Sequence, residues 1–161
     1  MKKFLKYFGI GLLVIIILAV SGFVLWASNP PAPEPTALDS LGSTPDVSYE
    51  TRDNWLIFTP TGDAPDTGLV MYPGGRVDYR AYAPHARAIA SEGFLVLVVP
   101  MPLNFAFLGV NRAADVIDAF PNIEYWAVGG HSLGGAMAAQ FTASQTDLVD
   151  GLVLWAAYSA Q

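Results

Sequence analysis

The chain has 161 residues, 53% of them hydrophobic, which is enough for one domain with a buried core. It has no cysteine, so disulfides and thiolate metal sites are excluded. Its three lysines lie within the first six residues, and the remainder carries five arginines against 14 acidic residues. So acidic a domain does not suit the phosphates of nucleic acid, and we expect no nucleic-acid partner.

An uncharged apolar run of 20 residues fills positions 8–27 and, as a helix, is long enough to cross the roughly 30 Å hydrocarbon core of a bilayer. All three lysines precede it, and the first acid follows at Glu34. By the positive-inside rule we expect residues 1–28 to be a single-pass membrane helix (signal anchor), with the domain on the extracytoplasmic side. The alternative is a signal peptide cleaved after the small residues that end the run, which would release a secreted domain.

The next segment, residues 29–45, contains five prolines and shows neither a helical nor a strand period. We expect a Pro-rich linker that holds the domain away from the membrane, with the folded domain over residues 46–161. At its start, residues 47–60 show two short β-rich runs about the turn-forming sequence Arg-Asp-Asn. This pattern predicts a hairpin that opens the sheet.

Short continuous apolar runs bounded by Gly or Pro, typical of strands buried on both faces, follow at 68–73, 94–100, 125–130 and 151–158. Segments of helical length alternate with them at 79–93, 109–120 and 132–144. The alternation predicts an α/β fold, a mostly parallel sheet with helices on both faces. Ligands in such sheets bind beyond the carboxyl ends of the strands, so the strand-to-helix turns are the places to search for a site.

One of these turns, Gly130-His131-Ser132-Leu133-Gly134, matches the pattern Gly-x-Ser-x-Gly between a predicted strand and a predicted helix. In such a turn the strained serine backbone lifts the hydroxyl clear, and the flanking glycines let strand and helix approach. The pattern predicts that Ser132 is a nucleophile. The alternative is a glycine-rich loop that only turns the chain or binds phosphate, although dinucleotide spacing and a P-loop lysine are both missing.

A nucleophilic serine of this kind needs two backbone N–H donors for the oxyanion of its tetrahedral intermediate. Leu133, the residue after the serine, supplies one. The turn 72–82 after the first interior strand is expected to supply the other, from Gly75 or, one residue away, from Gly74 or Arg76. The alternative is that the two glycines only shape a turn.

These residues resemble the α/β hydrolase family, through the Tyr-Pro-Gly turn, the segment DYRAYAPHARAIASEGF, and GGHSLGGAMAAQF followed by GLVLWAAYS. The resemblance covers residues 68–159. It implies a serine hydrolase (esterase-like) that acts on small-molecule ester or other acyl substrates, with the nucleophile at Ser132 and oxyanion donors at Leu133 and near Gly75. It also implies an acid and a histidine later in the chain, in the order serine, acid, histidine.

The sequence departs from that order because no histidine follows Ser132. Asp147 and Asp150 precede the last predicted strand, so we expect them at its amino end, on the wrong edge of the sheet. We interpret His131, inside the turn, and His85, on the helix after the first turn, as packing residues. No acid or histidine base is therefore found, and we expect that the chain is truncated before them.

Beside the predicted site, Arg76, Asp78 and Arg80 either contact substrate or pair on the surface, and the surface role is favoured. No metal cluster is found in the sequence, and no cofactor is implied. Two functions remain. The first is a membrane-tethered extracytoplasmic serine hydrolase, incomplete in this chain. The second is a non-catalytic hydrolase-like binding domain that keeps the cleft without the base and acid.

Overall fold

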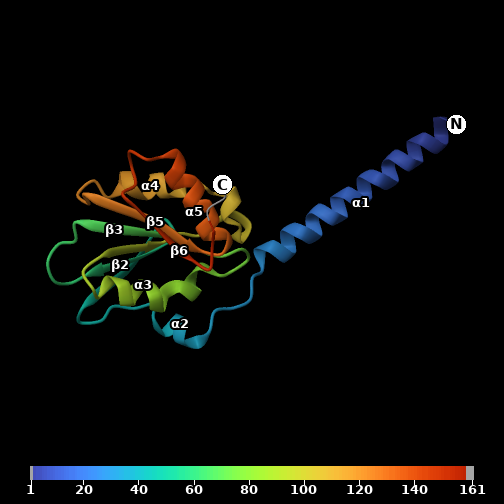
Figure 1. Ribbon diagram of the computed structural model, residues 1–161. Coiled ribbons are helices and arrows are strands. Elements are labelled where there is room, and N and C mark those ends of the chain that lie inside the picture. Colours follow the sequence, from blue (N-terminus) through green and yellow to red (C-terminus); the bar gives the residue numbers. More distant parts are fainter. Residues whose placement is uncertain (1, 159–161) are drawn as a thin grey trace.

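A computed structural model describes residues 2–158 of the chain. Within this range a long helix, α1 (Lys2–Ser28), projects from a domain built on one six-stranded sheet (Figure 1). The strands are β1 (Val47–Arg52), β2 (Trp55–Pro60), β3 (Thr67–Tyr72), β4 (Leu95–Val98), β5 (Tyr125–His131) and β6 (Gly151–Trp155). They lie in the order β1-β2-β4-β3-β5-β6. The pairs among β3, β4, β5 and β6 are parallel, and only β1 and β2 run antiparallel to their neighbours, so the prediction of a mostly parallel sheet is confirmed.

The predicted hairpin is β1 and β2, which occupy one edge of the sheet. Arg52 pairs with Trp55 across a two-residue turn. Both turn residues have positive φ, 54° at Asp53 and 64° at Asn54. Asp and Asn tolerate this left-handed region better than other non-glycine residues, and such turns match the twist of a hairpin.

Helices cover both faces of the sheet. Successive residues of β3 point to opposite faces, so their contacts show which helices lie on each side. Val70 and Tyr72 join a core cluster with α4 (Arg112–Ala119) and α5 (Leu133–Ser144). Leu69 and Met71 join a second cluster with α3 (Ala83–Ala90) on the other face. Strands buried from two sides must be apolar at every position, which is why the sequence showed continuous apolar runs rather than alternation.

The remaining elements are short. Three 3₁₀ helices, η1 (Tyr79–Tyr82), η2 (Pro102–Asn104) and η3 (Ala106–Leu108), lie in the turns that follow β3 and β4. The last strand, β6, ends at Trp155 rather than at the predicted residue 158, and Ala156 has a φ of 45° that breaks the extended backbone. β6 is the edge strand opposite β1, and its Leu152 and Leu154 are exposed.

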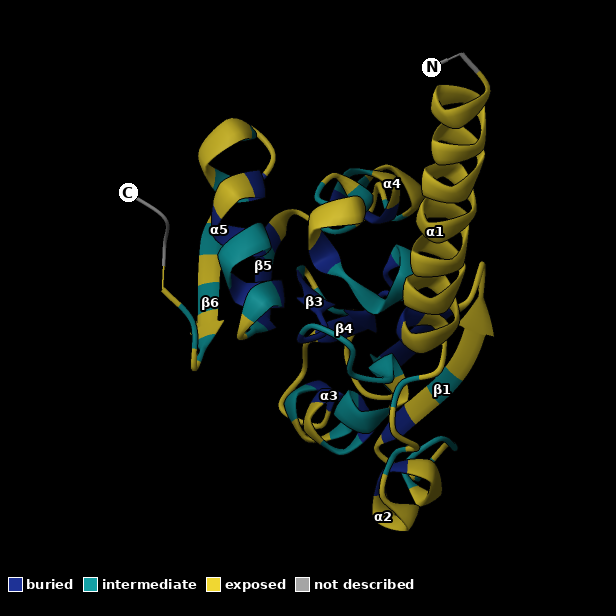
Figure 2. Cartoon of the chain, turned by 90° about the vertical axis from the view of Figure 1, so that its right-hand side faces the viewer, coloured by how far each residue is buried: buried dark blue, intermediate teal, exposed yellow. Residues whose placement is uncertain are grey.

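The expectation of a linker without regular structure is wrong for part of residues 29–45. A short helix, α2 (Pro35–Asp39), begins with a proline whose fixed φ suits a helix start. Arg87 of α3 donates hydrogen bonds to the carbonyl oxygens of Asp39 (3.3 Å) and Gly42 (3.0 Å), and Ala37 is buried. This segment therefore packs beside α3 (Figure 2). Its carbonyl groups accept hydrogen bonds from Arg87, a residue distant in the sequence, which local sequence patterns do not reveal.

Candidate active site

The turn between β5 and α5 holds Ser132 in a strained conformation, with φ 52° and ψ −120°. Its N–H donates to the carbonyl oxygen of Trp155 at 2.9 Å, and its own carbonyl oxygen accepts the N–H of Ala136 at 3.1 Å. These bonds to β6 and to α5 hold a backbone geometry that costs about 1–3 kcal/mol in a non-glycine residue. Ser132 is exposed and lies beyond the carboxyl end of β5.

Glycines around this turn are required by close backbone contacts. A Cβ at Gly130 would lie 2.6 Å from the carbonyl oxygen of Tyr72, and one at Gly135 would lie 2.6 Å from the carbonyl oxygen of Gly130. A Cβ at Gly134 would collide with the carbonyl oxygens of Tyr72 and Pro73. The start of α5 thus lies directly on the end of β3, which only residues without a side chain allow.

The turn after β3 offers three backbone amides, and two are already used. The N–H of Gly74 donates to the Tyr82 hydroxyl at 2.9 Å, and the N–H of Arg76 donates to the carbonyl oxygen of Asn104 at 2.7 Å. For the amide of Gly75, no acceptor is recorded within residues 2–158. Of the three alternatives that the sequence left open, Gly75 is thus the one whose N–H has no acceptor in the part of the chain that the structure describes.

Gly75 also lies next to the residue that follows the serine. A Cβ built on Gly75 would be 3.2 Å from Cδ2 of Leu133. Leu133 is the first residue of α5, and the first amides of a helix have no partner inside the helix. The positive end of the helix dipole adds to the attraction for an anion at this point. The fold therefore brings together the three residues that the sequence selected, Ser132, Leu133 and Gly75.

A family model described as "Alpha/beta hydrolase family" matches residues 68–161. The chain belongs to the α/β hydrolase family. Its fold resembles a bacterial heroin esterase (TM-score 0.60, 24% identity, 76% of this chain and 50% of that one). It also resembles a hyperthermophilic esterase from the archaeon Pyrobaculum calidifontis (0.56, 18%, 73% and 48%) and a membrane phospholipase A that is a bacterial virulence factor (0.52, 22%, 100% and 54%). The chain spans about half the length of these structures. No curated protein sequence matches it.

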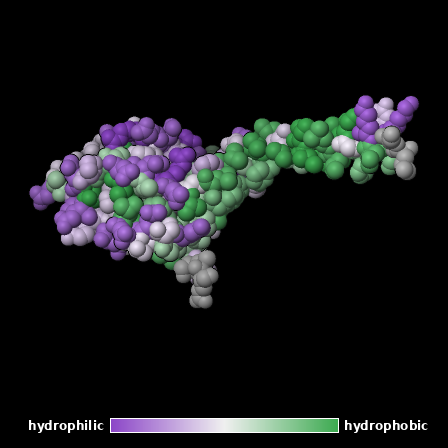
Figure 3. Space-filling view, turned by 90° about the horizontal axis from the view of Figure 1, so that it is seen from above, coloured by the Kyte–Doolittle hydropathy of each residue, from purple (hydrophilic) through white to green (hydrophobic). Residues whose placement is uncertain are grey.

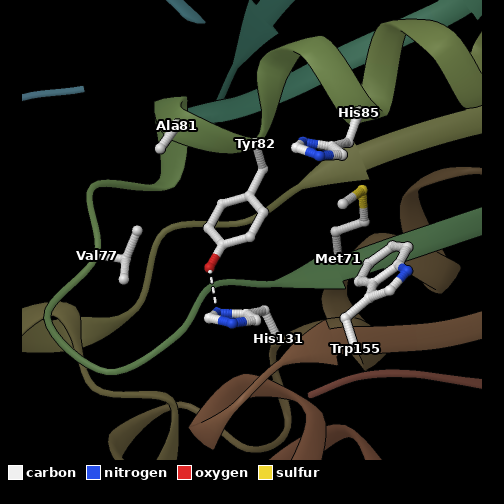
Figure 4. A pocket seen from close by; sticks show the side chains of 7 residues that line it. All are labelled: Met71, Val77, Ala81, Tyr82, His85, His131 and Trp155. Carbon is white, nitrogen blue, oxygen red and sulfur yellow. Dashed lines mark hydrogen bonds between the residues drawn. The ribbon is translucent and has the colours of Figure 1, made fainter. Parts of the chain in front are cut away.

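Beside the turn, the hydrolase domain has a mostly apolar cavity of about 450 Å³ on the side of the sheet that α3 covers (Figure 4). It is lined by Met71, Val77, Ala81, Tyr82, His85, His131 and Trp155. The Tyr82 hydroxyl lies 3.1 Å from Nδ1 of His131, and burial raises the pKa of Tyr82. His85 and His131, which the sequence suggested were separate packing residues, thus line one cavity. The hydrogen bond to His131 comes from Tyr82, which was not among the site residues predicted from the sequence.

The hydroxyl of Ser132 has no side-chain hydrogen-bond partner among the residues that the structure describes. Asp150 lies at the amino edge of the sheet, as predicted: its Oδ2 accepts the N–H of Trp126 at 2.8 Å, near the start of β5. Asp150 therefore has a structural role, in which its carboxylate accepts a backbone N–H near the start of β5. Within residues 2–158, neither an acid nor a histidine is hydrogen-bonded to the serine of this hydrolase domain.

The charged residues after the glycine turn divide into two groups. Arg80 and Asp78 form an ion pair of 2.6 Å, so the predicted surface pairing is confirmed for these two. Burial alone would raise the pKa of Asp78, but the hydrogen bonds from Arg80 outweigh it and hold that pKa below its ordinary value. For Arg76 the expectation is wrong, because its guanidinium instead binds the end of α1.

Arg76 donates from Nε to the carbonyl oxygen of Trp26 (3.0 Å) and from Nη2 to that of Asn29 (2.9 Å). Its guanidinium carbon lies 4.3 Å from the centroid of the Trp26 ring, in cation–π geometry. Nδ2 of Asn104 donates to the carbonyl oxygen of Ala27 at 2.9 Å. The last carbonyl groups of α1, which a helix cannot satisfy itself, are therefore bound by the loops that follow β3 and β4.

Proposed function

We propose that this chain is a membrane-tethered, extracytoplasmic serine hydrolase of acyl esters, with Ser132 as the nucleophile. One observation carries the proposal: in a chain of the α/β hydrolase family, Ser132 is an exposed serine with φ 52° at the junction of β5 and α5. Support for the tether comes from α1. The most apolar 18-residue stretch of its span Lys3–Ser28 has a mean hydropathy of 2.8 and no buried residue, and all three lysines lie at the free end of the helix.

In this reaction, Oγ of Ser132 attacks the carbonyl carbon of the ester while a base takes the hydroxyl proton. The carbonyl oxygen becomes an oxyanion that the amides of Leu133 and Gly75 stabilise. Collapse of the intermediate breaks the bond to the alcohol, which leaves with a proton, and the acyl group stays on Ser132 until water releases it as an acid. We assign no base to His85 or His131, because neither is hydrogen-bonded to Ser132 in the described residues.

A second candidate function is a binding domain that keeps the cleft without catalysis. The observation that favours it is the same lack of a side-chain partner for the Ser132 hydroxyl within residues 2–158. Such a domain would still hold a ligand against the free amides of Leu133 and Gly75. The two functions differ in whether Ser132 forms a covalent bond.

A fluorophosphonate probe separates them, because it reacts only with a serine that can act as a nucleophile. We expect labelling of the full chain that is lost in Ser132→Ala and kept in Ser144→Ala, a matched control at the far end of α5 whose hydroxyl donates to the Phe141 carbonyl oxygen. If no histidine assists, hydroxide must remove the proton, and the rate should rise about tenfold per pH unit without levelling off near pH 7.

Each outcome of this experiment is decisive. Labelling that depends on Ser132 supports the hydrolase, and its lack at every pH would leave the binding domain. A rate that levels off above about pH 7 would indicate a histidine base, since the ordinary pKa of histidine is about 6.5. Loss of that plateau in His85→Ala or in His131→Ala would then name the base.

A further inference from the structure

The end of α1 is attached to the edge of the sheet where the candidate site lies. Arg76 belongs to the turn after β3 and Asn104 to the loop after β4, and both bind carbonyl groups in the last turn of α1 or just beyond it. These loops follow the carboxyl ends of parallel strands, as Ser132 does. Figure 1 shows α1 extending away from the domain at this junction. If α1 spans a bilayer, the carboxyl edge of the sheet therefore faces the membrane.

The Phe105 ring contacts both α1 and Gly75 of the candidate site. The Phe105 ring stacks on Phe23 of α1, with centroids 6.0 Å apart and an interplanar angle of 12°, and it lies 6.2 Å from the Trp26 ring. Cε1 of Phe105 is 3.6 Å from the position of a Cβ on Gly75. Tryptophan near the end of a membrane helix belongs at the interface, so an α1 that spans a bilayer would place Gly75 next to the lipid headgroups.

The domain also exposes apolar side chains beside this junction. Phe107 is 50% and Leu108 46% exposed, and the Phe107 ring lies 5.3 Å from that of Phe105. We call Phe105, Phe107 and Leu108 the apolar rim. Figure 3 shows the apolar surface of α1 continuing as far as the domain. An apolar rim continuous with a membrane helix fits the boundary between headgroups and acyl chains.

Acidic residues lie at the opposite end of the domain. A surface hollow between the loops that precede β3 and β4 is lined by polar residues, among them four carboxylates: Asp46, Asp63, Asp66 and Glu92. The amino edge of the sheet is therefore the charged, well-hydrated end. This distribution agrees with an orientation in which the amino edge points to water and the carboxyl edge to lipid.

We propose that α1 and the apolar rim hold the carboxyl edge of the sheet on the bilayer surface, and that the substrates are acyl-ester lipids of that leaflet. The inference rests on the proposed function of Ser132 and adds its substrate class. A lipid ester already lies at the interface, and extracting its acyl chains into water costs free energy in proportion to the number of methylene groups. A site beside the headgroups receives the ester without that cost.

The orientation is tested first, without any catalysis. The chain contains no cysteine, so a single introduced cysteine can carry a fluorophore unambiguously. The full chain with Phe107→Cys or, as control at the amino edge, Glu92→Cys is placed in phosphatidylcholine vesicles with nitroxide-headgroup lipids. We expect strong quenching at position 107 and little at position 92. Equal quenching at the two positions would overturn the proposed orientation.

The substrate class is tested with two fluorophosphonates, one carried on a diacyl lipid in the vesicles and one short and water-soluble. We expect the wild-type chain to react faster with the lipid-borne probe. In Phe23→Ala/Trp26→Ala, which lacks the aromatic contacts to Phe105 and Arg76, this preference should fall by about fivefold or more. Phe4→Ala/Phe8→Ala, a matched loss of aromatic rings at the free end of α1, should keep it.

The soluble probe separates failure of this inference from failure of the proposed function, and it also reports whether each variant is folded. Ser132-dependent labelling by the soluble probe without a preference for the lipid-borne one would overturn the lipid substrate and leave the hydrolase. Labelling by neither probe, with quenching at position 107 intact, would overturn the hydrolase and leave the orientation. An equal loss of preference in both double variants would refute a specific role for the α1 junction.

Discussion

Replacing Gly130 by alanine should destabilise the domain because the space for a methyl group is closed by backbone atoms. The new Cβ would lie 2.6 Å from the Tyr72 carbonyl oxygen and 2.6 Å from the Gly134 carbonyl carbon, whereas ordinary contact begins at 3.4 Å. The end of β3 and the start of α5 would have to separate from β5 by about 0.8 Å. Overpacking a core lowers the free energy of unfolding by about 1–3 kcal/mol. Because the atoms contacted here belong to the backbone and cannot move aside as side chains do, we expect a loss of about 3 kcal/mol.

For a domain of this size each kcal/mol lowers the melting temperature by roughly 4 °C, so Gly130→Ala should melt about 12 °C below the wild type. Thermal unfolding followed by circular dichroism measures this. Gly62→Ala is the matched control, since a Cβ there meets nothing within 4 Å, and its melting temperature should change by a few degrees at most. A Gly130→Ala protein that melts within about 2 °C of the wild type would refute the steric argument.

The Gly75 amide, the Asp78–Arg80 pair and α1 can each be tested separately. Gly75→Pro, which removes the free amide, should slow fluorophosphonate labelling of Ser132 by about 10² relative to Gly75→Ala, which keeps it; equal rates would exclude that amide as a donor. Arg80 lowers the pKa of Asp78, so Asp78 stabilises the fold above its ordinary pKa of 3.8, and this contribution is lost as the pH falls below that value. Acid unfolding curves should therefore show a stability difference between wild type and Asp78→Asn that is present at pH 6, is at most about 1 kcal/mol for this partly exposed pair, and shrinks as the pH falls below 3.8. A difference that stays constant with pH would contradict the pairing. Protease added to intact cells should degrade the domain while α1 stays with the membrane, and a soluble product that begins at Asn29 would show instead that α1 is a cleaved signal peptide.

Local patterns in the sequence were sufficient for the sheet and for the turn that holds Ser132. Parallel strands covered on both faces must be apolar throughout, so β3, β4 and β5 could be recognised as continuous apolar runs. The edge strand β6 was recognised by the same kind of run, although its Leu152 and Leu154 are exposed. Glycine is required at positions 130 and 134 because a side chain there would collide with nearby backbone atoms. Both positions lie within two residues of Ser132, so their spacing predicted a strand, a strained turn and a helix.

Whether a backbone amide is free depends on groups far away in the chain, and the sequence could not decide it. The sequence favoured Gly75 by its position and kept Gly74 and Arg76 as alternatives, and the fold supplies the Tyr82 hydroxyl and the Asn104 carbonyl oxygen as acceptors for those two. The shared cavity of His85 and His131 has the same origin, since α3 and the end of β5 meet only when the sheet has formed.

The amino-acid sequence is sufficient to identify α1 as an apolar helix with lysines at its free end, because length, composition and charge order are properties of one segment. That the other end of α1 is bound to the domain beside the candidate site follows only from the folded chain. That junction depends on Arg76 and Asn104 reaching carbonyl groups about 50 and 77 positions away in the chain. Hydrophobic periodicity records which face of an element is buried, but it carries no information about which distant hydrogen-bond donors will meet the unsatisfied end of a helix.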